Sequence, residues 1–313
     1  MRIVQFHKYG PPQVLEVASS KQPEPGRGEV CVRVSAAGIN PKDCLVRKGK
    51  FSVVTGKKFP QTLGQDFAGQ VEKLGPGVTG LQRSERVFGM VNRWTGGAYA
   101  EYIVAPFDEL ARMPETISYE QAAAVPLAAQ TALQALRNLA NVQPGQKILI
   151  NGASGGVGSF AVQIAKILGA HVTAVCSDAN LKLVRELGAD EAIDYRQTNL
   201  LTLPTRFDMF FDVFGNKNYS RSKHLLTRRG VYVHTIPNLK NAAWHLLTRW
   251  LPGKRGLLVV VRSRRSDLET LAGWITAGKI HPLIDRSLPL AEVQAAHTYI
   301  ETKRARGKVV LVV

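Results

Sequence analysis

The sequence has few cysteines and no long apolar run. Only Cys31, Cys44 and Cys176 occur among its 313 residues, too few and too scattered for a disulfide framework or a structural zinc lobe of closely spaced thiolates. No window approaches the roughly 18 apolar residues that span a bilayer, and the N-terminal MRIVQFHKYG lacks the apolar core of a secretory signal. We therefore expect a cytoplasmic protein with reduced thiols, which at most lies on a membrane surface.

Acidic residues are missing from one long segment. Between Val213 and Ser266 the chain has no Asp or Glu, whereas it has twelve Lys and Arg residues there. The formal net charge of the whole chain is +17, so most of the excess belongs to this part, which we call the basic segment. Such a concentration of charge is typical of contact with nucleic acid or with an anionic membrane.

The basic segment carries no recognised RNA- or DNA-binding motif, so nucleic acid is not the expected partner. Within residues 239–255, four apolar residues recur at helical spacing among basic ones: Trp244, Leu247, Trp250 and Leu251. This pattern is typical of a helix that lies in the interface of an anionic membrane. It is equally typical of a helix whose apolar stripe packs in a core or a dimer contact, and both interpretations stay open.

The pattern of apolar residues changes near Gly145. Before it, alternation in RIVQF, VLEVA and EVCVRVSAAG predicts the strands of a mainly antiparallel domain, and SYEQAAAVPLAAQTALQALRNL predicts one long helix with Ser118 as N-cap and Gln121 three places on. After it, strands alternate with amphipathic helices, as in KILING, GSFAVQIAKILG and HVTAVCS, which predicts a parallel sheet covered on both faces. We expect an α/β fold with a catalytic domain at 1–122 and 283–313 and a doubly wound domain at 123–282.

A glycine-rich loop follows the first strand of that doubly wound domain. Residues 151–158 (NGASGGVG) stand between an apolar strand and an amphipathic helix. Glycines at such a turn let the backbone approach a pyrophosphate, and the N–H groups of the helix N-terminus favour its negative charge. The loop predicts a Rossmann-type dinucleotide-binding domain, with these cofactor contacts: Ser154, Gly155, Gly156, Val157 and Gly158.

The end of the second strand indicates which dinucleotide binds. An NAD enzyme typically places Asp or Glu there to bind the ribose 2′-OH, and that carboxylate repels a 2′-phosphate. Here the strand ends at Ser177, and Asp178 lies beyond it. NADPH is therefore the expected cofactor, with Ser177 as a hydroxyl donor. Lys182 and Arg185 on the next helix are nearby charges, although each is also typical of a solvated helix face.

Five segments, in this order along the chain, resemble the medium-chain dehydrogenases/reductases. They are AGINPKD at 37–43, GQDFAG at 64–69, GGAYAEY at 96–102, the loop at 151–158 and LGADEAIDY at 187–195. The stretches 40–49, 58–60 and 282–290 are most similar to the branch of chloroplast envelope quinone oxidoreductase homologues and their bacterial relatives. The resemblance covers essentially the whole chain. It implies that the catalytic domain is GroES-like.

The resemblance also implies a site without zinc. The zinc alcohol dehydrogenases of this family have Cys in place of Asn40 and His in place of Gln65, and they carry a run of four cysteines that is missing here. In the NADPH-using members, a Ser or Thr, a basic residue and a Tyr hold the 2′-phosphate; these map onto Ser177, Asn180 and Tyr195. Asn180 departs from the pattern because an amide carries no charge. Tyr195 is alternatively an aromatic residue packed at a strand end.

The activity implied is hydride transfer from NADPH to a quinone or to the β-carbon of an α,β-unsaturated carbonyl, without a metal. We expect Asn40 beside the nicotinamide, with its carboxamide donating to the acceptor's oxygen; the alternative is a turn residue that caps Pro41. Asp43 either orients this site or caps the next helix, and its position favours the cap. By analogy with the family, Thr131 and Phe214 also contact the cofactor.

Assembly and rival functions complete the expectations. GLLVVV at 256–261 predicts the last strand of the parallel sheet, and the family often pairs this apolar edge across a homodimer. Two alternatives to the enzyme remain: a basic nucleic-acid-binding protein, and a scaffolding protein that has lost catalysis. The physiological acceptor, quinone or enone, does not follow from the sequence, because variable loops build the substrate pockets of this fold.

Overall fold

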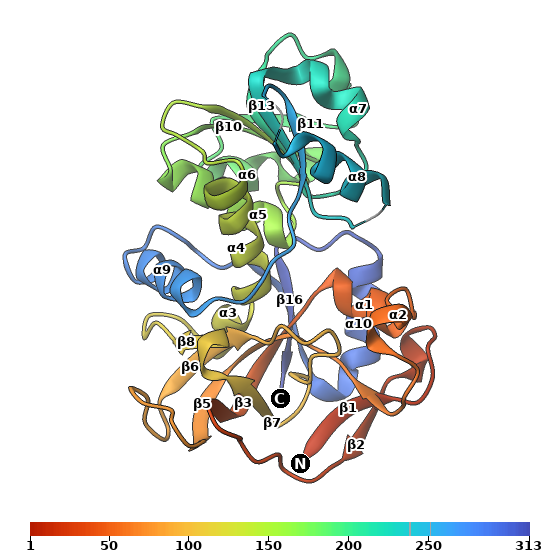
Figure 1. Ribbon diagram of the computed structural model, residues 1–313, viewed down its shortest axis with the longest axis vertical. Coiled ribbons are helices and arrows are strands. Elements are labelled where there is room, and N and C mark those ends of the chain that lie inside the picture. Colours follow the sequence, from red (N-terminus) through yellow and green to blue (C-terminus); the bar gives the residue numbers. More distant parts are fainter. Residues whose placement is uncertain (238, 251) are drawn as a thin grey trace. The chain divides into compact units, whose positions relative to one another are not determined.

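The chain folds into two compact units in the computed structural model, which describes residues 1–237, 239–250 and 252–313 (Figure 1). Unit 1 comprises 1–130 and 262–313, and unit 2 comprises 131–261. The expected boundaries therefore move, because 123–130 and 262–282 cluster with unit 1. The reason is local packing: helix α9 (Arg265–Thr276) lies against strand β8 (Leu110–Arg112), and the Arg265 guanidinium is 4.1 Å from the centroid of the Phe107 ring.

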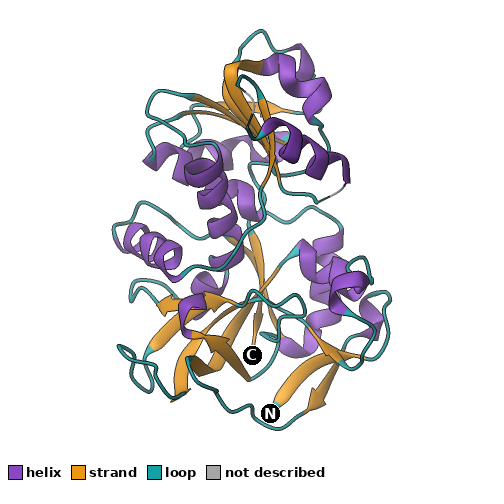
Figure 2. Cartoon of the chain, viewed as in Figure 1, coloured by secondary structure: helices purple, strands orange, loops and turns teal. Residues whose placement is uncertain are grey.

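Unit 1 is built on mainly antiparallel sheets, as the alternation of its first strands predicts, with one parallel pair, β15 and β16 (Figure 2). A seven-stranded sheet has the order β15-β16-β3-β5-β6-β8, with β7 paired to β3, and a three-stranded sheet has the order β2-β1-β4. The strands are β1 (Arg2–Phe6), β2 (Glu16–Ser19), β3 (Glu29–Ile39), β4 (Gln61–Thr62), β5 (Asp66–Leu74), β6 (Arg86–Met90), β7 (Tyr102–Pro106), β15 (Ile284–Pro289) and β16 (Lys308–Val312). The C-terminal strand β16 pairs with β3, so the end of the chain completes this unit, as expected.

The helical stretch 118–139, which runs from unit 1 into unit 2, is not the one long helix that was expected. Ser118 and Gln121 do form a capping box at the start of α3 (Tyr119–Ala123). Helix α3 nevertheless ends before Pro126, and α4 (Pro126–Leu133) begins at it, because proline lacks an N–H and suits only a first turn. A π-helical turn, Gln134–Leu139, follows in unit 2. Besides α3, α9 and the start of α4, unit 1 has the helices α1 (Pro41–Arg47), α2 (Ser52–Thr55) and α10 (Val293–Glu301).

Unit 2 is a doubly wound α/β domain. Its six parallel strands have the order β11-β10-β9-β12-β13-β14. The strands are β9 (Lys147–Asn151), β10 (His171–Cys176), β11 (Glu191–Asp194), β12 (Phe207–Asp212), β13 (Leu226–His234) and β14 (Arg255–Leu258), and the helices are α5 (Gly156–Ile167), α6 (Leu181–Glu186), α7 (Tyr219–Ser222) and α8 (Leu239–Thr248). The chain order reverses between β9 and β12, which is the point where ligands of such sheets bind, outside the carboxyl ends of the strands.

Shorter elements join these strands and helices. One-turn 3₁₀ helices occur at Pro12–Val14, Phe107–Glu109, Asp178–Asn180, Leu200–Thr202, Lys223–Leu225 and Leu290–Glu292. Among the residues described, no helix is long and apolar enough to cross a membrane.

Candidate functional site

The phosphate loop of unit 2 has the geometry that a pyrophosphate requires. Strand β9 ends at Asn151, Gly155 is the N-cap of α5, and no side chain of the described residues caps that helix. The first N–H groups of α5 therefore point outward without an intrahelical acceptor, and the helix dipole favours an anion there. A Cβ on Gly158 would lie 2.1 Å from the Gly152 carbonyl oxygen, so only glycine lets α5 pack onto the loop, while a Cβ on Gly155 would meet only that same oxygen, at 3.6 Å. The loop thus fits a dinucleotide.

A buried polar network stabilises the carboxyl ends of β9 and β12. The Asn151 Nδ2 donates to Asp212 Oδ1 at 2.7 Å and to Asn216 Oδ1 at 2.9 Å. The Tyr232 hydroxyl donates to Asp212 Oδ2 at 2.8 Å. Asp212 also accepts from backbone N–H groups of the following loop, which carries Phe214. These bonds fix that loop beside the phosphate loop, where the Phe214 N–H donates to the Asn151 carbonyl at 3.2 Å.

The residues expected at the 2′-phosphate lie together. Asn180 Nδ2 donates to Ser154 Oγ at 3.1 Å and to Ser177 Oγ at 3.3 Å, so the amide joins the phosphate loop to the end of β10. Tyr195 follows the neighbouring strand β11, and its N–H donates to the Cys176 carbonyl at 3.2 Å. The Tyr195 side chain is 53% exposed, so it is not buried at this strand end.

Charge near this cluster comes from a residue that the sequence analysis did not single out. Arg196 is exposed, and its guanidinium is 5.9 Å from the centroid of the Tyr195 ring. The Arg196 N–H donates to Asp194 Oδ1, which fixes the turn after β11. Lys182, in contrast, extends into solvent, and its ammonium lies 3.8 Å from the Glu186 carboxylate. The sequence feature that points to Arg196 as a basic residue near the 2′-phosphate is its position directly after the Tyr of the family motif.

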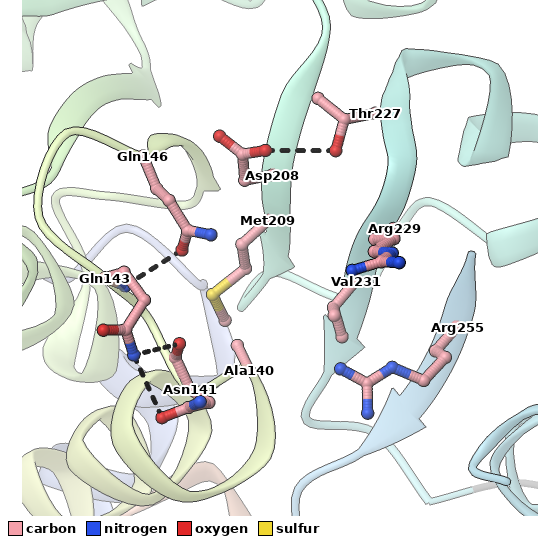
Figure 3. A pocket seen from close by; sticks show the side chains of 10 residues that line it. All are labelled: Ala140, Asn141, Gln143, Gln146, Asp208, Met209, Thr227, Arg229, Val231 and Arg255. Carbon is pink, nitrogen blue, oxygen red and sulfur yellow. Dashed lines mark hydrogen bonds between the residues drawn. The ribbon is translucent and has the colours of Figure 1, made fainter. Parts of the chain in front are cut away.

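A hollow of about 240 Å³ lies elsewhere in unit 2, and Figure 3 shows the residues that line it. They include Gln146 before β9, Asp208 in β12 and Arg229 in β13, which come before the carboxyl ends of their strands. The Thr227 hydroxyl donates to Asp208 Oδ1 at 3.1 Å in this wall (Figure 3). Because dinucleotides bind at the carboxyl ends of such strands, this hollow is not the cofactor site.

Unit 1 contains a buried cluster of three polar side chains around Asn40. The Asn40 Nδ2 donates to Asp66 Oδ2 at 2.9 Å, and the Lys308 ammonium donates to the Asn40 Oδ1 and, at 3.2 Å, to Asp66 Oδ2. The Leu127 N–H donates to Asp66 Oδ1 at 2.9 Å. All three side chains are almost fully buried. Burial raises the pKa of Asp66, whereas the Lys308 charge and the bonds from Asn40 and Leu127 oppose that rise.

Asp43 holds the start of α1. Its Oδ2 accepts from the Asn40 N–H and from the Tyr99 hydroxyl, each at 2.9 Å. Burial raises the pKa of Asp43 to about 6, although both hydrogen bonds lower it. Asp43 therefore caps its own helix rather than the next one. Asn40 occupies the N-cap position of α1, and its carboxamide bonds to Asp66 and Lys308.

Helix α1 is also fixed at its other end. The fully buried Arg47 donates to the Gly10 carbonyl at 3.1 Å, approaches His297 Nδ1 at 3.2 Å and pairs with Glu301. His297 and Glu301 belong to α10, so the guanidinium joins α1 to α10. This anchor holds Asn40 and Asp43 at a fixed place in unit 1.

The Asn40 carboxamide, expected to donate to the acceptor's oxygen, already takes part in two buried bonds. One N–H of Nδ2 is engaged by Asp66, and the carbonyl oxygen is engaged by Lys308. An amide nitrogen has two hydrogens, so one donor remains. Asp66, Tyr99 and Lys308 were missed in the sequence.

Thr131 and Gln65 remain to be placed. Thr131 lies buried in α4, and its contact with a cofactor stays a prediction. Gln65 Nε2 donates to the carbonyls of Val91 at 3.0 Å and Arg93 at 3.1 Å, so this amide has a structural role. In the described part of the chain, no group of three or more His, Cys, Asp or Glu could hold a metal ion.

Comparison with known proteins assigns the chain to a family. The alcohol dehydrogenase GroES-like domain matches residues 26–115, and the zinc-binding dehydrogenase domain matches residues 187–311. The chloroplast envelope quinone oxidoreductase homologue of Arabidopsis thaliana is 31% identical over 99% of this chain and 98% of its own. The chloroplastic NADPH-dependent alkenal/one oxidoreductase of the same plant is 34% identical over 98% of this chain and 78% of its own. The quinone oxidoreductase of Coxiella burnetii superposes with a TM-score of 0.92 at 31% identity, covering 100% of this chain and 99% of that one.

The fold, the phosphate loop and these relatives define an oxidoreductase of the medium-chain dehydrogenase/reductase type. The chain belongs to the quinone oxidoreductase branch of that family. One of the matched domains is named for zinc binding. The resemblance described above implies that Asn40 and Gln65 stand where the zinc enzymes have Cys and His.

Proposed function

We propose that this protein is an NADPH-dependent reductase that transfers hydride to a quinone or to the β-carbon of an α,β-unsaturated carbonyl, without a metal. The observation that carries the proposal is the cluster of Ser154, Ser177, Asn180 and Tyr195 beside the phosphate loop, with no carboxylate at the end of β10. Relatives named for quinones and for alkenals and enones support the acceptor class. When bound, the nicotinamide supplies the hydride chemistry.

The residues of the chain would bind and orient the cofactor and the acceptor. In unit 2, the N–H groups at the start of α5 hold the pyrophosphate, and Ser177 and Tyr195 hold the 2′-phosphate. In unit 1, the remaining N–H of Asn40 donates to the acceptor's oxygen. The Lys308 ammonium on the other end of the same amide withdraws electron density from it and so strengthens this donor. Thr131 and Phe214 contribute further cofactor contacts.

Arg196 would supply the charge that Asn180 lacks. The Asn180 amide is already bonded to two hydroxyls and carries no charge, whereas a phosphate is bound best by a charge-assisted donor. Arg196 is exposed directly after Tyr195, on the same turn. Its guanidinium can present parallel donors to phosphate oxygens.

We expect wild-type protein to have a higher kcat/KM with NADPH than with NADH. Arg196→Gln should lower the value for NADPH by roughly 10- to 100-fold and leave that for NADH unchanged, because a hydrogen bond to a charged group contributes about 1.5 to 3 kcal/mol. Steady-state kinetics with both cofactors, with Lys182→Gln as the exposed control, measures this. Equal efficiency with NADH in the wild type would refute the preference for NADPH, and an equal loss with both cofactors in Arg196→Gln would refute the role of Arg196.

We also propose a homodimer that pairs the edge of the parallel sheet. Strand β14 is the last strand of the sheet, and Val260, just beyond it, is exposed. An apolar edge of this kind is an aggregation hazard unless another chain covers it. We expect light scattering at micromolar concentration to give the mass of a dimer and Val260→Asp to give a monomer, with Val53→Asp in α2 as the control. A monomeric wild type would contradict the assembly.

A cytoplasmic location with peripheral contact to an anionic membrane is the remaining part of the proposal. The free, buried thiols of Cys31, Cys44 and Cys176 suit a reducing compartment. The basic segment, which has no acid between Val213 and Ser266, suits an anionic surface.

A further inference from the structure

Helix α8, in the middle of the basic segment, has two apolar faces. The inner face includes Trp244, whose ring centroid is 5.1 Å from that of Tyr219 and which packs against the core beneath β13. For Trp244 this agrees with the interpretation in which the apolar stripe packs in a core, and not with the one in which it meets a membrane. Leu251, also expected on that stripe, lies outside the described residues.

The outer face of α8 and the turn after it is a different set of residues. Leu239, Leu246, Leu247 and Trp250 are 90%, 66%, 62% and 80% exposed, and we call them the outer stripe. Their spacing of i, i+7, i+8 and i+11 places all four on one side of a helix. Four large apolar side chains exposed together are unusual on a protein surface and indicate a site of contact with another molecule or a membrane.

Cations border the outer stripe on both sides. Lys240 and Arg249 are exposed, and at helical spacing they fall on opposite flanks of the stripe. The Arg249 guanidinium lies 4.5 Å from the centroid of the Trp250 ring. No acidic residue of the basic segment neutralises them, because the chain has none between Val213 and Ser266. The surface therefore combines an apolar stripe with a positive border.

We propose that the outer stripe of α8 inserts into the headgroup region of an anionic bilayer, with Lys240 and Arg249 bound to lipid phosphates. This inference names the surface that makes the proposed membrane contact, and it rests on that part of the proposed function. Apolar side chains that enter the acyl boundary and cations that remain at the headgroups are what an interfacial helix presents. A lipid-soluble quinone would be met at that same surface.

Other occupants fit the outer stripe less well. In a symmetric dimer through this patch the patch faces itself, so each Lys240 and Arg249 would meet like charges, and the basic segment has no acid to offset them. Nucleic acid would satisfy the cations but would leave the leucines of the stripe without an apolar partner. An anionic bilayer satisfies both parts of the surface.

Co-sedimentation of the full chain with vesicles tests the proposal. We expect binding to vesicles of phosphatidylcholine and phosphatidylglycerol at low salt, release at high salt, and little binding to phosphatidylcholine alone. The variant Leu247→Ser/Trp250→Ser should weaken binding by about tenfold or more, and Lys240→Gln/Arg249→Gln by a similar factor. Val53→Ser and Lys57→Gln, which change exposed residues of unit 1, are the matched controls and should bind as the wild type does.

Oxidation of NADPH by a water-soluble quinone, measured on the same variants, separates this inference from the enzymatic proposal. We expect unchanged turnover in all of them, because none of the substituted residues is among those proposed to bind the cofactor or the acceptor. Absence of binding to anionic vesicles at low salt would overturn the inference and leave the reductase standing. Binding to vesicles that neither α8 variant weakens would also overturn the inference. Loss of the dimer in Leu247→Ser/Trp250→Ser would overturn it too, because the outer stripe would then contact a second copy of the chain.

Discussion

Replacing Lys308 with Met should lower the free energy of unfolding by about 3 to 5 kcal/mol at neutral to alkaline pH, the usual cost of leaving a buried charge without its partner. Asp66 is 0% exposed, and the Lys308 ammonium, 3.2 Å from Oδ2, is its counter-charge. Without the ammonium, only neutral donors remain for the carboxylate, namely the amide of Asn40 and the N–H of Leu127. Urea unfolding followed by circular dichroism measures the loss.

The pH dependence of that loss identifies its cause. Burial already raises the pKa of Asp66, and removal of the Lys308 charge raises it further. A carboxyl whose pKa is higher in the folded than in the unfolded state binds more protons when folded, so its contribution to stability is present at low pH and is lost as pH rises through the folded pKa. The deficit of Lys308→Met relative to the wild type should therefore shrink as the pH is lowered toward the unfolded pKa of about 3.9.

Two further variants make the test specific. Arg306→Met removes an exposed cation two residues earlier and should change stability little, because isolated surface charges contribute little. Lys308→Met/Asp66→Asn removes both buried charges and should recover much of the lost stability. A deficit of the same size at every pH, or no recovery in the double variant, would show that the side chain of Lys308 stabilises by packing instead.

The parts of the molecule that depend on local sequence were predictable. The glycines of the loop at 151–158 act within eight residues, and the alternation of strands and helices in unit 2 is a local periodicity, so both the doubly wound sheet and its phosphate loop follow from the sequence. The cluster around Asn40 does not, because Lys308 is 268 residues away from it along the chain. In the sequence, Lys308 is an ordinary first residue of a strand, and only the pairing of β16 with β3 gives it a partner.

Helices were predictable as elements but not in their packing. The periodicity of 239–255 indicates a helix, but α8 has apolar residues on both faces, so the pattern could not decide that Trp244 turns inward. The amphipathic pattern of α9 likewise does not say which unit it packs on, and it joins β8 of unit 1. Pro126 is a local signal for a break, but the long Ala-rich stretch around it favoured the prediction of one continuous helix.

Asn40→Ala should lower kcat by about 100- to 1000-fold with both quinone and enone acceptors, because removal of one donor to a developing oxyanion costs ~2.7 to 4 kcal/mol. NADPH binding should change little, since the residues proposed to hold it belong to unit 2. The Asp66–Lys308 pair and the bond from the Asn40 N–H to Asp43 do not depend on the carboxamide, so the helix start should remain intact. Steady-state kinetics together with a direct NADPH titration separates the two effects.

A loss of stability must be distinguished from a loss of catalysis in this variant. Gln61→Ala provides the comparison, because Gln61 is another buried amide of unit 1, and its Nε2 donates at 3.1 Å to the carbonyls of Thr55 and Gly56. We expect both variants to unfold at lower urea concentration than the wild type, since each loses buried hydrogen bonds. Only Asn40→Ala should lose turnover under conditions where both are folded. Turnover of Asn40→Ala equal to that of Gln61→Ala would assign the carboxamide to the buried cluster alone, and the donor to the acceptor's oxygen would then have to be sought in another group of unit 1.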